Sequence, residues 1–241
     1  MRRKTGVAPL VWVTGSSKGI GEAIARAFAG IGARVILSGR DRKKLADVRR
    51  LIVKSYGWGE IIPCDIASEK SVERAHATIV KKFGAVDVLV NNAGVTYFTS
   101  FEKTTMKQFD QIIGTNLRGT FLCTKAVLPS MLRRRAGWIF TINSVSAITT
   151  FFDSSAYAAS KAGMLAMTRG LRAEVRKKGV KVIDILPGAV ETEMWDKSER
   201  KKSGNKMMKP DDVASVVVSL YCQPERALTE EIVLRPPEGD L

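Results

Sequence analysis

The chain has 241 residues, 45% of them hydrophobic and 26% charged, a composition that can bury a core and that excludes a disordered or fibrous chain. Three widely separated cysteines and one histidine argue against a disulfide framework, a metal site or a Ser/His/Asp triad. Basic residues exceed acidic ones by 39 to 24, which gives a net charge of +15. Because no nucleic-acid-binding motif accompanies this charge, we interpret the charge as a basic surface on a protein that binds anionic cofactors, and we expect no nucleic-acid partner.

Short apolar runs alternate along the chain with longer amphipathic stretches, a pattern that predicts strands alternating with helices. We predict strands over residues 10–13, 34–38, 60–64, 86–90, 138–142, 180–186 and 231–234. We predict helices over residues 20–30, 42–54, 69–83, 106–135 (interrupted near Gly114 and Gly119), 156–178 and 211–221.

The predicted strands are continuous apolar runs, such as the Val-Ile-Leu of residues 35–37 and the Val-Leu-Val of residues 88–90. Strands that are buried on both faces have this composition, because the helices that connect parallel strands cover both faces. The alternation therefore predicts an α/β fold: a single doubly wound parallel sheet of about seven strands, of the Rossmann type, with helices on both faces and one domain over residues 1–241. Ligands bind such sheets beyond the carboxyl ends of the strands.

No predicted element suits a membrane. The longest stretch without a formal charge, residues 136–152, is rich in serine, threonine and asparagine and is too polar for a span. Arg2, Arg3 and Lys4 precede an apolar run over residues 7–13, but no small-residue cleavage site of a signal peptide follows it. We therefore expect a soluble, cytoplasmic protein.

A glycine-rich turn follows the first predicted strand and opens a helix. Gly15, Gly19 and Gly21 have the spacing G-x-x-x-G-x-G, which differs from the G-x-G-x-x-G of the common dinucleotide fingerprint. Glycines at such a turn allow the backbone to approach a pyrophosphate, which then lies on the positive N-terminus of the helix. The turn predicts a dinucleotide site.

The second predicted strand ends in Ser-Gly-Arg40. At this point an acidic residue normally binds the ribose 2′-hydroxyl of NAD, whereas an arginine accommodates the 2′-phosphate of NADP. Lys18 adds a second cation close by. We therefore predict NADP (NADPH) as the cofactor.

Tyr157 and Lys161 are four residues apart on a predicted helix and share one of its faces. A lysine ammonium close to a phenol lowers the phenol pKa from about 10 and eases proton exchange near neutrality. Ser144, just after the fifth predicted strand, could hold a substrate oxygen beside them.

Together these motifs show that the chain resembles the short-chain dehydrogenase/reductase family over nearly its whole length. The spacings from Ser144 to Tyr157 and from Asn116 to Tyr157 also agree with the family. The matching segments are the turn of residues 14–21, Asp65, the Asn-Asn-Ala-Gly of residues 91–94, Asn116 within Asn-Leu-Arg-Gly, Ser144, the Tyr-Ala-Ala-Ser-Lys of residues 157–161, and Pro187-Gly188.

The resemblance implies hydride transfer between a nicotinamide and a carbonyl or secondary alcohol carbon. Tyr157 would be the general acid in reduction and the base in oxidation, and Ser144 would position the substrate oxygen. Lys161 would bind the nicotinamide ribose and lower the Tyr157 pKa, and Asn116 would help to hold a proton-relay water.

The resemblance also implies the residues that contact the cofactor. Asp65 and Ile66 would contact the adenine, residues 92–94 the adenosine and ribose, and Val190 and Thr192 the carboxamide. The whole implied set is Gly15, Ser17, Lys18, Gly19, Ile20, Gly21, Arg40, Asp65, Ile66, Asn92, Ala93, Gly94, Tyr157, Lys161, Pro187, Gly188, Val190 and Thr192.

The C-terminal tail departs from one branch of the family, because it lacks the Asp-Gly-Gly ending common among reductases of acyl-carrier-protein thioesters. It looks more like NADP-dependent reductases of ketones, 3-oxo acids and 3-hydroxy acids, and we expect that function. A 3-oxoacyl-[acyl-carrier-protein] reductase remains an alternative, as does, from another class, a nucleotide-sensing or nucleic-acid-binding protein on the same fold.

A basic stretch over residues 191–209 is expected to be a substrate lid, which would suit an anionic substrate or form a solvated face. Phe151, Phe152, Met194 and Trp195 are either core or the lining of an apolar pocket. The family usually pairs through the helices near residues 106 and 156, so we expect a homodimer or homotetramer.

Overall fold

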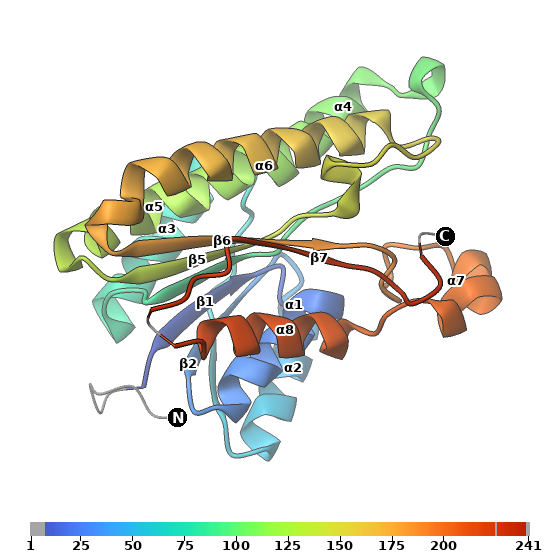
Figure 1. The fold of residues 1–241 in the computed structure, drawn as a ribbon. Coiled ribbons are helices and arrows are strands. Elements are labelled where there is room, and N and C mark those ends of the chain that lie inside the picture. Colours follow the sequence, from blue (N-terminus) through green and yellow to red (C-terminus); the bar gives the residue numbers. More distant parts are fainter. Residues whose placement is uncertain (1–7, 225, 240–241) are drawn as a thin grey trace.

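The computed structural model describes residues 8–224 and 226–239 (Figure 1), so the N-terminal basic residues and the last two residues of the tail lie outside the described part. Seven strands form one sheet in the order β3-β2-β1-β4-β5-β6-β7, and every neighbouring pair is parallel. The strands are β1 (Leu10–Thr14), β2 (Arg34–Ser38), β3 (Trp58–Ile61), β4 (Val88–Asn91), β5 (Gly137–Ile142), β6 (Val180–Pro187) and β7 (Glu231–Leu234). The predicted doubly wound sheet is confirmed.

Helices cover both faces of this sheet. In Figure 1, α1, α2 and α8 lie below it, and α3, α4, α5 and α6 lie above it. Their bounds are α1 (Gly19–Gly30), α2 (Arg42–Lys54), α3 (Glu69–Phe83), α4 (Met106–Ile112), α5 (Gly119–Arg134), α6 (Ser155–Val175), α7 (Lys197–Ser203) and α8 (Pro210–Tyr221). None of the described helices is both long and apolar enough to cross a bilayer.

The continuous apolar runs are explained by two cores, one on each face of the sheet. In β1, Val11 and Val13 join the core that α1, α2 and α8 cover, whereas Leu10 and Trp12 join the core that α3 and α5 cover. All four side chains are at most 2% exposed. A central strand therefore needs an apolar residue at every position, because neither face meets water.

Several helices begin at side chains that cap their first turn. Asp41 accepts a hydrogen bond from the Lys44 amide (3.0 Å) at the start of α2. Thr105 and Gln108 form a capping box at the start of α4, and α8 begins with Pro210 at its first position. Asp41, Thr105 and Gln108 satisfy amides that have no partner within the helix, whereas Pro210 has no amide hydrogen to leave unpaired, and both arrangements favour a helix start at that point.

Three segments differ from the predicted elements. The stretch 106–135 is two α-helices joined by a π-helix, Ile113–Arg118. Helix α7 was not predicted, because its seven residues are all polar and show no apolar periodicity. Strand β3 ends at Ile61 rather than continuing to Cys64. Beyond Ile61, the Ile62 and Cys64 amides still donate to the carbonyls of Leu37 and Gly39.

Candidate active site

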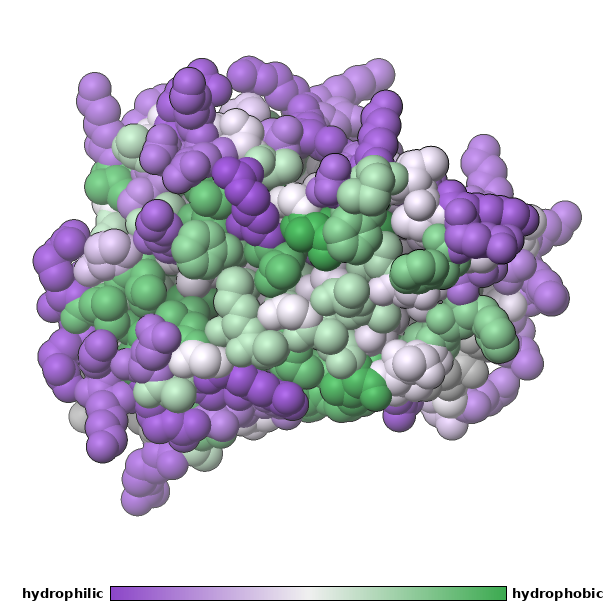
Figure 2. Space-filling view, turned by 90° about the horizontal axis from the view of Figure 1, so that it is seen from above, coloured by the Kyte–Doolittle hydropathy of each residue, from purple (hydrophilic) through white to green (hydrophobic). Residues whose placement is uncertain are grey.

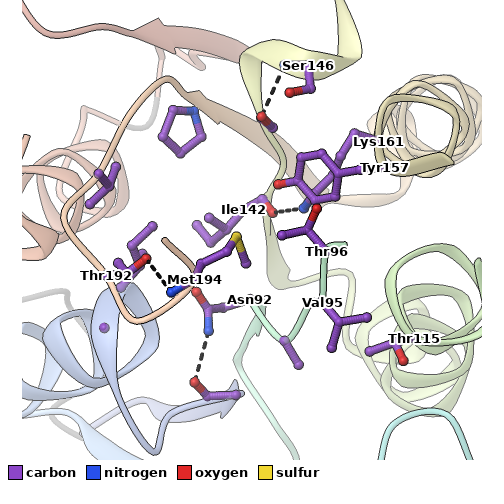
Figure 3. A pocket seen from close by; sticks show the side chains of 18 of the residues that line it. Asn92, Val95, Thr96, Thr115, Ile142, Ser146, Tyr157, Lys161, Thr192 and Met194 are labelled. Carbon is purple, nitrogen blue, oxygen red and sulfur yellow. Dashed lines mark hydrogen bonds between the residues drawn. The ribbon is translucent and has the colours of Figure 1, made fainter. Parts of the chain in front are cut away.

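A cleft of about 840 Å³ opens at the carboxyl ends of the central strands, where β1 and β4 lie side by side and the chain order reverses. Ligands bind at this point in doubly wound sheets. Of the predicted cofactor and catalytic residues, all line the cleft except Gly21 and Asn116, which lie just behind its wall. Figure 3 shows several of them around the opening.

The glycine-rich turn forms a cradle that tolerates no larger residue. Gly15 and Gly19 have φ values of 64° and 58°, the left-handed region that favours glycine. A Cβ atom on Gly15 would lie 2.7 Å from the Ala93 Cα, and one on Gly21 would overlap the Asn92 side chain. The cradle faces the N-terminus of α1, so the residues present fit the pyrophosphate of a dinucleotide.

Thr14 and Asn92 join the turn to the end of β4. The Thr14 hydroxyl donates to the Val90 carbonyl (3.1 Å) and accepts from the amides of Asn92 (3.1 Å) and Ala93 (3.2 Å). The Asn92 side chain donates to the carbonyls of Thr14 (3.0 Å) and Gly15 (3.1 Å). These bonds fix the two loops that form the floor of the cleft.

At one end of the cleft, residues after β2 and β3 form a site suited to an adenosine. Arg40 is exposed and, among the described residues, makes no hydrogen bond or ion pair. Asp65 is held by the Ala67 amide, which donates to its carboxylate (3.1 Å), and Ile66 beside it is 5% exposed. A fixed carboxylate, an apolar side chain and an available guanidinium can bind an adenine and a 2′-phosphate.

Ser144, Tyr157 and Lys161 meet near the centre of the cleft. Tyr157 and Lys161 come from the first turns of α6, and Ser144 lies two residues after the end of β5, where its hydroxyl accepts from the Ser146 amide (3.0 Å). The Lys161 ammonium donates to the Ile142 carbonyl (3.0 Å) and lies 5.6 Å from the centre of the Tyr157 ring. Figure 3 shows the Lys161–Ile142 bond beneath that ring.

Burial is the largest influence on the pKa values of Tyr157 and Lys161. It raises the pKa of Tyr157 to about 12, against a hydrogen bond with Ser144 that lowers it. Burial also lowers the pKa of Lys161 to about 8, against the charge of Asp184, which raises it. The net shift of the Tyr157 pKa is therefore upward, opposite in direction to the lowering expected from Lys161, because burial penalises the phenolate.

Asn116 is placed by the π-helix and does not face the cleft. Its side-chain oxygen accepts from the Val95 amide (2.8 Å), and its amide group donates to the Val95 carbonyl (2.9 Å) and the Ser160 hydroxyl (3.0 Å). The Ser160 hydroxyl in turn donates to the Tyr157 carbonyl (2.7 Å). The Asn116 side chain therefore fixes the loop after β4 to the helix that carries Tyr157.

The far end of the cleft is apolar. The sequence left open whether Phe151, Phe152, Met194 and Trp195 belong to the core or to a pocket. All four border the cleft, although Phe152 is fully exposed. Trp195 stacks on Phe98, with ring centres 5.4 Å apart. The basic side chains of residues 197–206 do not line it, so this end suits a neutral, apolar group.

Two parts of the cleft were missed by sequence reasoning. Thr96, Tyr97 and Phe98 line it and follow β4, so the rule of looking after each strand could have found them. Glu193 lines it too and pairs with Lys18, a contact that no local pattern signals. Among the described residues no cluster of three or more His, Cys, Asp or Glu could hold a metal ion.

Comparison with known proteins agrees with this geometry. A family model described as short chain dehydrogenase matches residues 9–203. The sepiapterin reductase of Chlorobaculum tepidum is 38% identical over 242 residues, covering 96% of this chain and 98% of that protein.

Two solved structures have a very similar fold. A metagenomic short-chain oxidoreductase in complex with NADP is 33% identical, with a TM-score of 0.84 over 95% of this chain and 96% of that one. A variant of the actinorhodin polyketide ketoreductase with NADPH is 29% identical, with a TM-score of 0.88 over 95% of each chain. The cofactor of both structures agrees with the NADP predicted from Arg40 and Lys18.

Proposed function

The chain belongs to the short-chain dehydrogenase family and is an oxidoreductase, and we propose that it is an NADP-dependent reductase of a neutral, largely apolar ketone, acting in reverse on the secondary alcohol. The observation that carries this proposal is the meeting of Ser144, Tyr157 and Lys161 between a dinucleotide cradle and an apolar wall. The cofactor and the substrate would thus approach the same three side chains from opposite ends of the cleft.

The chain's own residues would handle the oxygen and its proton. A bound nicotinamide cofactor supplies the hydride that adds to the carbonyl carbon. Ser144 would donate a hydrogen bond to the carbonyl oxygen, and the Tyr157 hydroxyl, protonated at neutral pH because its pKa is about 12, would give its proton to that oxygen as negative charge develops. The Lys161 ammonium, fixed on the Ile142 carbonyl, would stabilise the phenolate that remains until solvent reprotonates it.

The choice of NADP is supported by the cations at the adenosine end. Lys18 and Arg40 line the cleft there, and a 2′-phosphate carries the charge that they would pair with. Initial rates and dissociation constants with NADPH and NADH test this assignment. We expect tighter binding of NADPH; equal or tighter binding of NADH would contradict it.

The substrate class is supported by the wall of Phe98, Phe151, Met194 and Trp195. A screen of NADPH oxidation with aryl ketones, β-keto esters, 3-oxo acids, acyl thioesters and sepiapterin separates the candidates. We expect the neutral ketones to give the highest kcat/KM. A strong preference for acyl thioesters would favour the alternative 3-oxoacyl-[acyl-carrier-protein] reductase, and a preference for free 3-oxo acids would contradict a neutral pocket.

Tyr157→Phe tests the chemistry. It removes the proton donor and keeps the ring, so we expect turnover to fall at least about 100-fold while NADPH binding stays within about twofold. Tyr56→Phe is the matched control, because Tyr56 is fully exposed. Normal turnover of Tyr157→Phe would refute the mechanism, and a salt-sensitive gel shift without any reductase activity would favour the nucleic-acid-binding alternative.

We also propose that the chain forms a homo-oligomer through the face of α4, α5 and α6. Phe109, Met106 and Phe121 are 38–70% exposed there, and Figure 2, seen from the side of α6, shows an apolar band bordered by charged side chains. Such bands mark interaction surfaces. Sedimentation at micromolar concentration should give a dimer or tetramer, and Phe121→Glu should give a monomer; a wild-type monomer would refute the proposal.

Two further features are proposed. The segment 191–209 would act as a lid, since Thr192, Met194 and Trp195 line the cleft.

The cytoplasm would be the compartment, since Cys64, Cys123 and Cys222 are all free thiols and a reducing environment keeps them so. Fractionation of the source cells tests the second: recovery outside the cytoplasmic fraction would contradict it.

A further inference from the structure

An acidic side chain lies among the cations of the adenosine end. Glu193, in the segment 191–209, accepts hydrogen bonds from the ammonium groups of Lys18 (2.7 Å) and Lys44 (3.0 Å). Lys18 belongs to the glycine-rich turn, and Lys44 to the first turn of α2. One carboxylate therefore joins three separate parts of the chain.

The Glu193 carboxylate lies among side chains that the proposed 2′-phosphate would also contact. Lys18, Arg40 and Glu193 all line the same end of the cleft, and the Lys44 amide is fixed by the Asp41 cap beside Arg40. Lys18, Lys44 and Arg40 would attract the 2′-phosphate of NADP, but the two lysines are already paired with Glu193. The pairing keeps the Glu193 carboxyl ionised, since both lysines lower its pKa to about 2.

The same contacts attach the segment 191–209 to the cofactor side of the cleft. Thr192 lies against Gly19, where an added Cβ would approach its methyl group to 3.2 Å. Three residues further on, Trp195 stacks on Phe98 at the substrate side. Residues 192–195 are thus held at both edges of the cleft, and Glu193 forms the charged attachment.

We propose that Glu193 sets cofactor specificity and affinity by competing with the 2′-phosphate of NADP for Lys18 and Lys44. The phosphate takes the place of the carboxylate, so binding of NADP releases the cofactor-side attachment of the segment 191–209. NADH has a hydroxyl in place of this phosphate and gains nothing from the exchange. This inference rests on the proposed NADP dependence.

Glu193→Gln tests the competition, because glutamine keeps the shape of the side chain and removes its charge. All three side chains are 43–49% exposed, and exposed ion pairs change equilibria only severalfold. We expect Glu193→Gln to tighten NADPH binding about three- to tenfold and to leave NADH binding within about twofold. Isothermal titration calorimetry at low salt measures both constants without turnover.

The matched control is Glu191→Gln. Glu191 lies two residues away in the same segment and pairs with Lys209, outside the cleft lining, so NADPH binding should not change. Adenosine 2′,5′-bisphosphate, which has the 2′-phosphate but no nicotinamide, should show the same three- to tenfold gain in Glu193→Gln, and adenosine 5′-monophosphate should show none.

The outcomes are distinct. Weaker or unchanged NADPH binding in Glu193→Gln, an equal gain for NADH, or an equal gain in Glu191→Gln would overturn the competition. A wild-type preference for NADH would instead overturn the proposed cofactor, whatever the variants do. Preference of the wild-type protein for NADPH together with a gain confined to Glu193→Gln and to ligands with a 2′-phosphate supports both.

Discussion

A buried ion pair between α6 and β6 predicts how the stability of the protein depends on pH. Arg172 donates to the Asp184 carboxylate (2.7 Å), and the side chains are 8% and 0% exposed. Thr168 donates to the other Asp184 oxygen (2.9 Å), and Arg172 also donates to the Val182 carbonyl (3.0 Å) and to Glu231 (2.9 Å). Arg172→Met keeps much of the apolar stem and removes every one of its bonds.

The loss should be large and should grow with pH. Removing one partner of a buried pair costs about 3–5 kcal/mol, because the other charge stays buried without compensation. Burial already raises the pKa of Asp184 to about 6, above the value of about 3.9 in an unfolded chain, and loss of Arg172 raises it further. The folded variant therefore holds the proton more tightly than the folded wild-type protein, so its deficit is greatest above pH 7 and shrinks as Asp184 is protonated at lower pH.

Urea unfolding followed by tryptophan fluorescence, at one fixed protein concentration, measures this deficit. We expect the full 3–5 kcal/mol at pH 8, as above, and about half of it or less at pH 5.5. Arg169→Met is the control: Arg169 pairs with Glu231 but is 54% exposed, so its loss should stay below about 1 kcal/mol at both pH values. A deficit for Arg172→Met below about 1 kcal/mol at pH 8, or one of the same size at both pH values, would refute the reasoning.

Three other predictions concern the cleft and the thiols. Gly21→Ala should abolish cofactor binding in calorimetry, because the new methyl group would overlap Asn92, whereas Gly30→Ala, with no atom within 4 Å of the added Cβ, should bind normally; normal binding by Gly21→Ala would contradict the cradle. The pKa of Lys161 is about 8, so kcat/KM for reduction should fall above pH 8 and Lys161→Arg should move that limb upward; a flat profile to pH 10 would argue against the role of the ammonium. Cys222, the exposed one of the three thiols, should react first with a thiol reagent, and mapping of the label to another cysteine by mass spectrometry would disprove this.

Local sequence patterns were enough to predict the sheet and most of the cleft. The apolar runs report burial on both faces, and in a parallel sheet every carboxyl end points to one edge. Residues as distant as Gly15, Ser144 and Pro187 could therefore be assigned to one site without coordinates. The same rule shows why Gly21 and Asn116, which support the wall rather than form it, were not distinguished from the lining.

Contacts between distant residues and the effects of burial could not be predicted. Glu193 is 175 residues from Lys18 and 149 from Lys44, and nothing in its local sequence marks a phosphate-like position. The spacing of Tyr157 and Lys161 indicates a shared helix face but not how deeply that face is buried. That depth gives Tyr157 a raised pKa, because burial penalises the phenolate, although Lys161 lies only 5.6 Å from the ring centre.

The π-helix of Ile113–Arg118 makes the active site depend on chain length as well as on residue type. A π-turn holds one more residue than an α-turn, and in a regular α-helix each residue adds about 100° of rotation. Deleting one residue here would restore a regular helix and turn Asn116 away from Val95 and Ser160, although every side chain of the site would still be encoded. The register of this one turn is thus what aligns the loop after β4 with the helix that carries Tyr157.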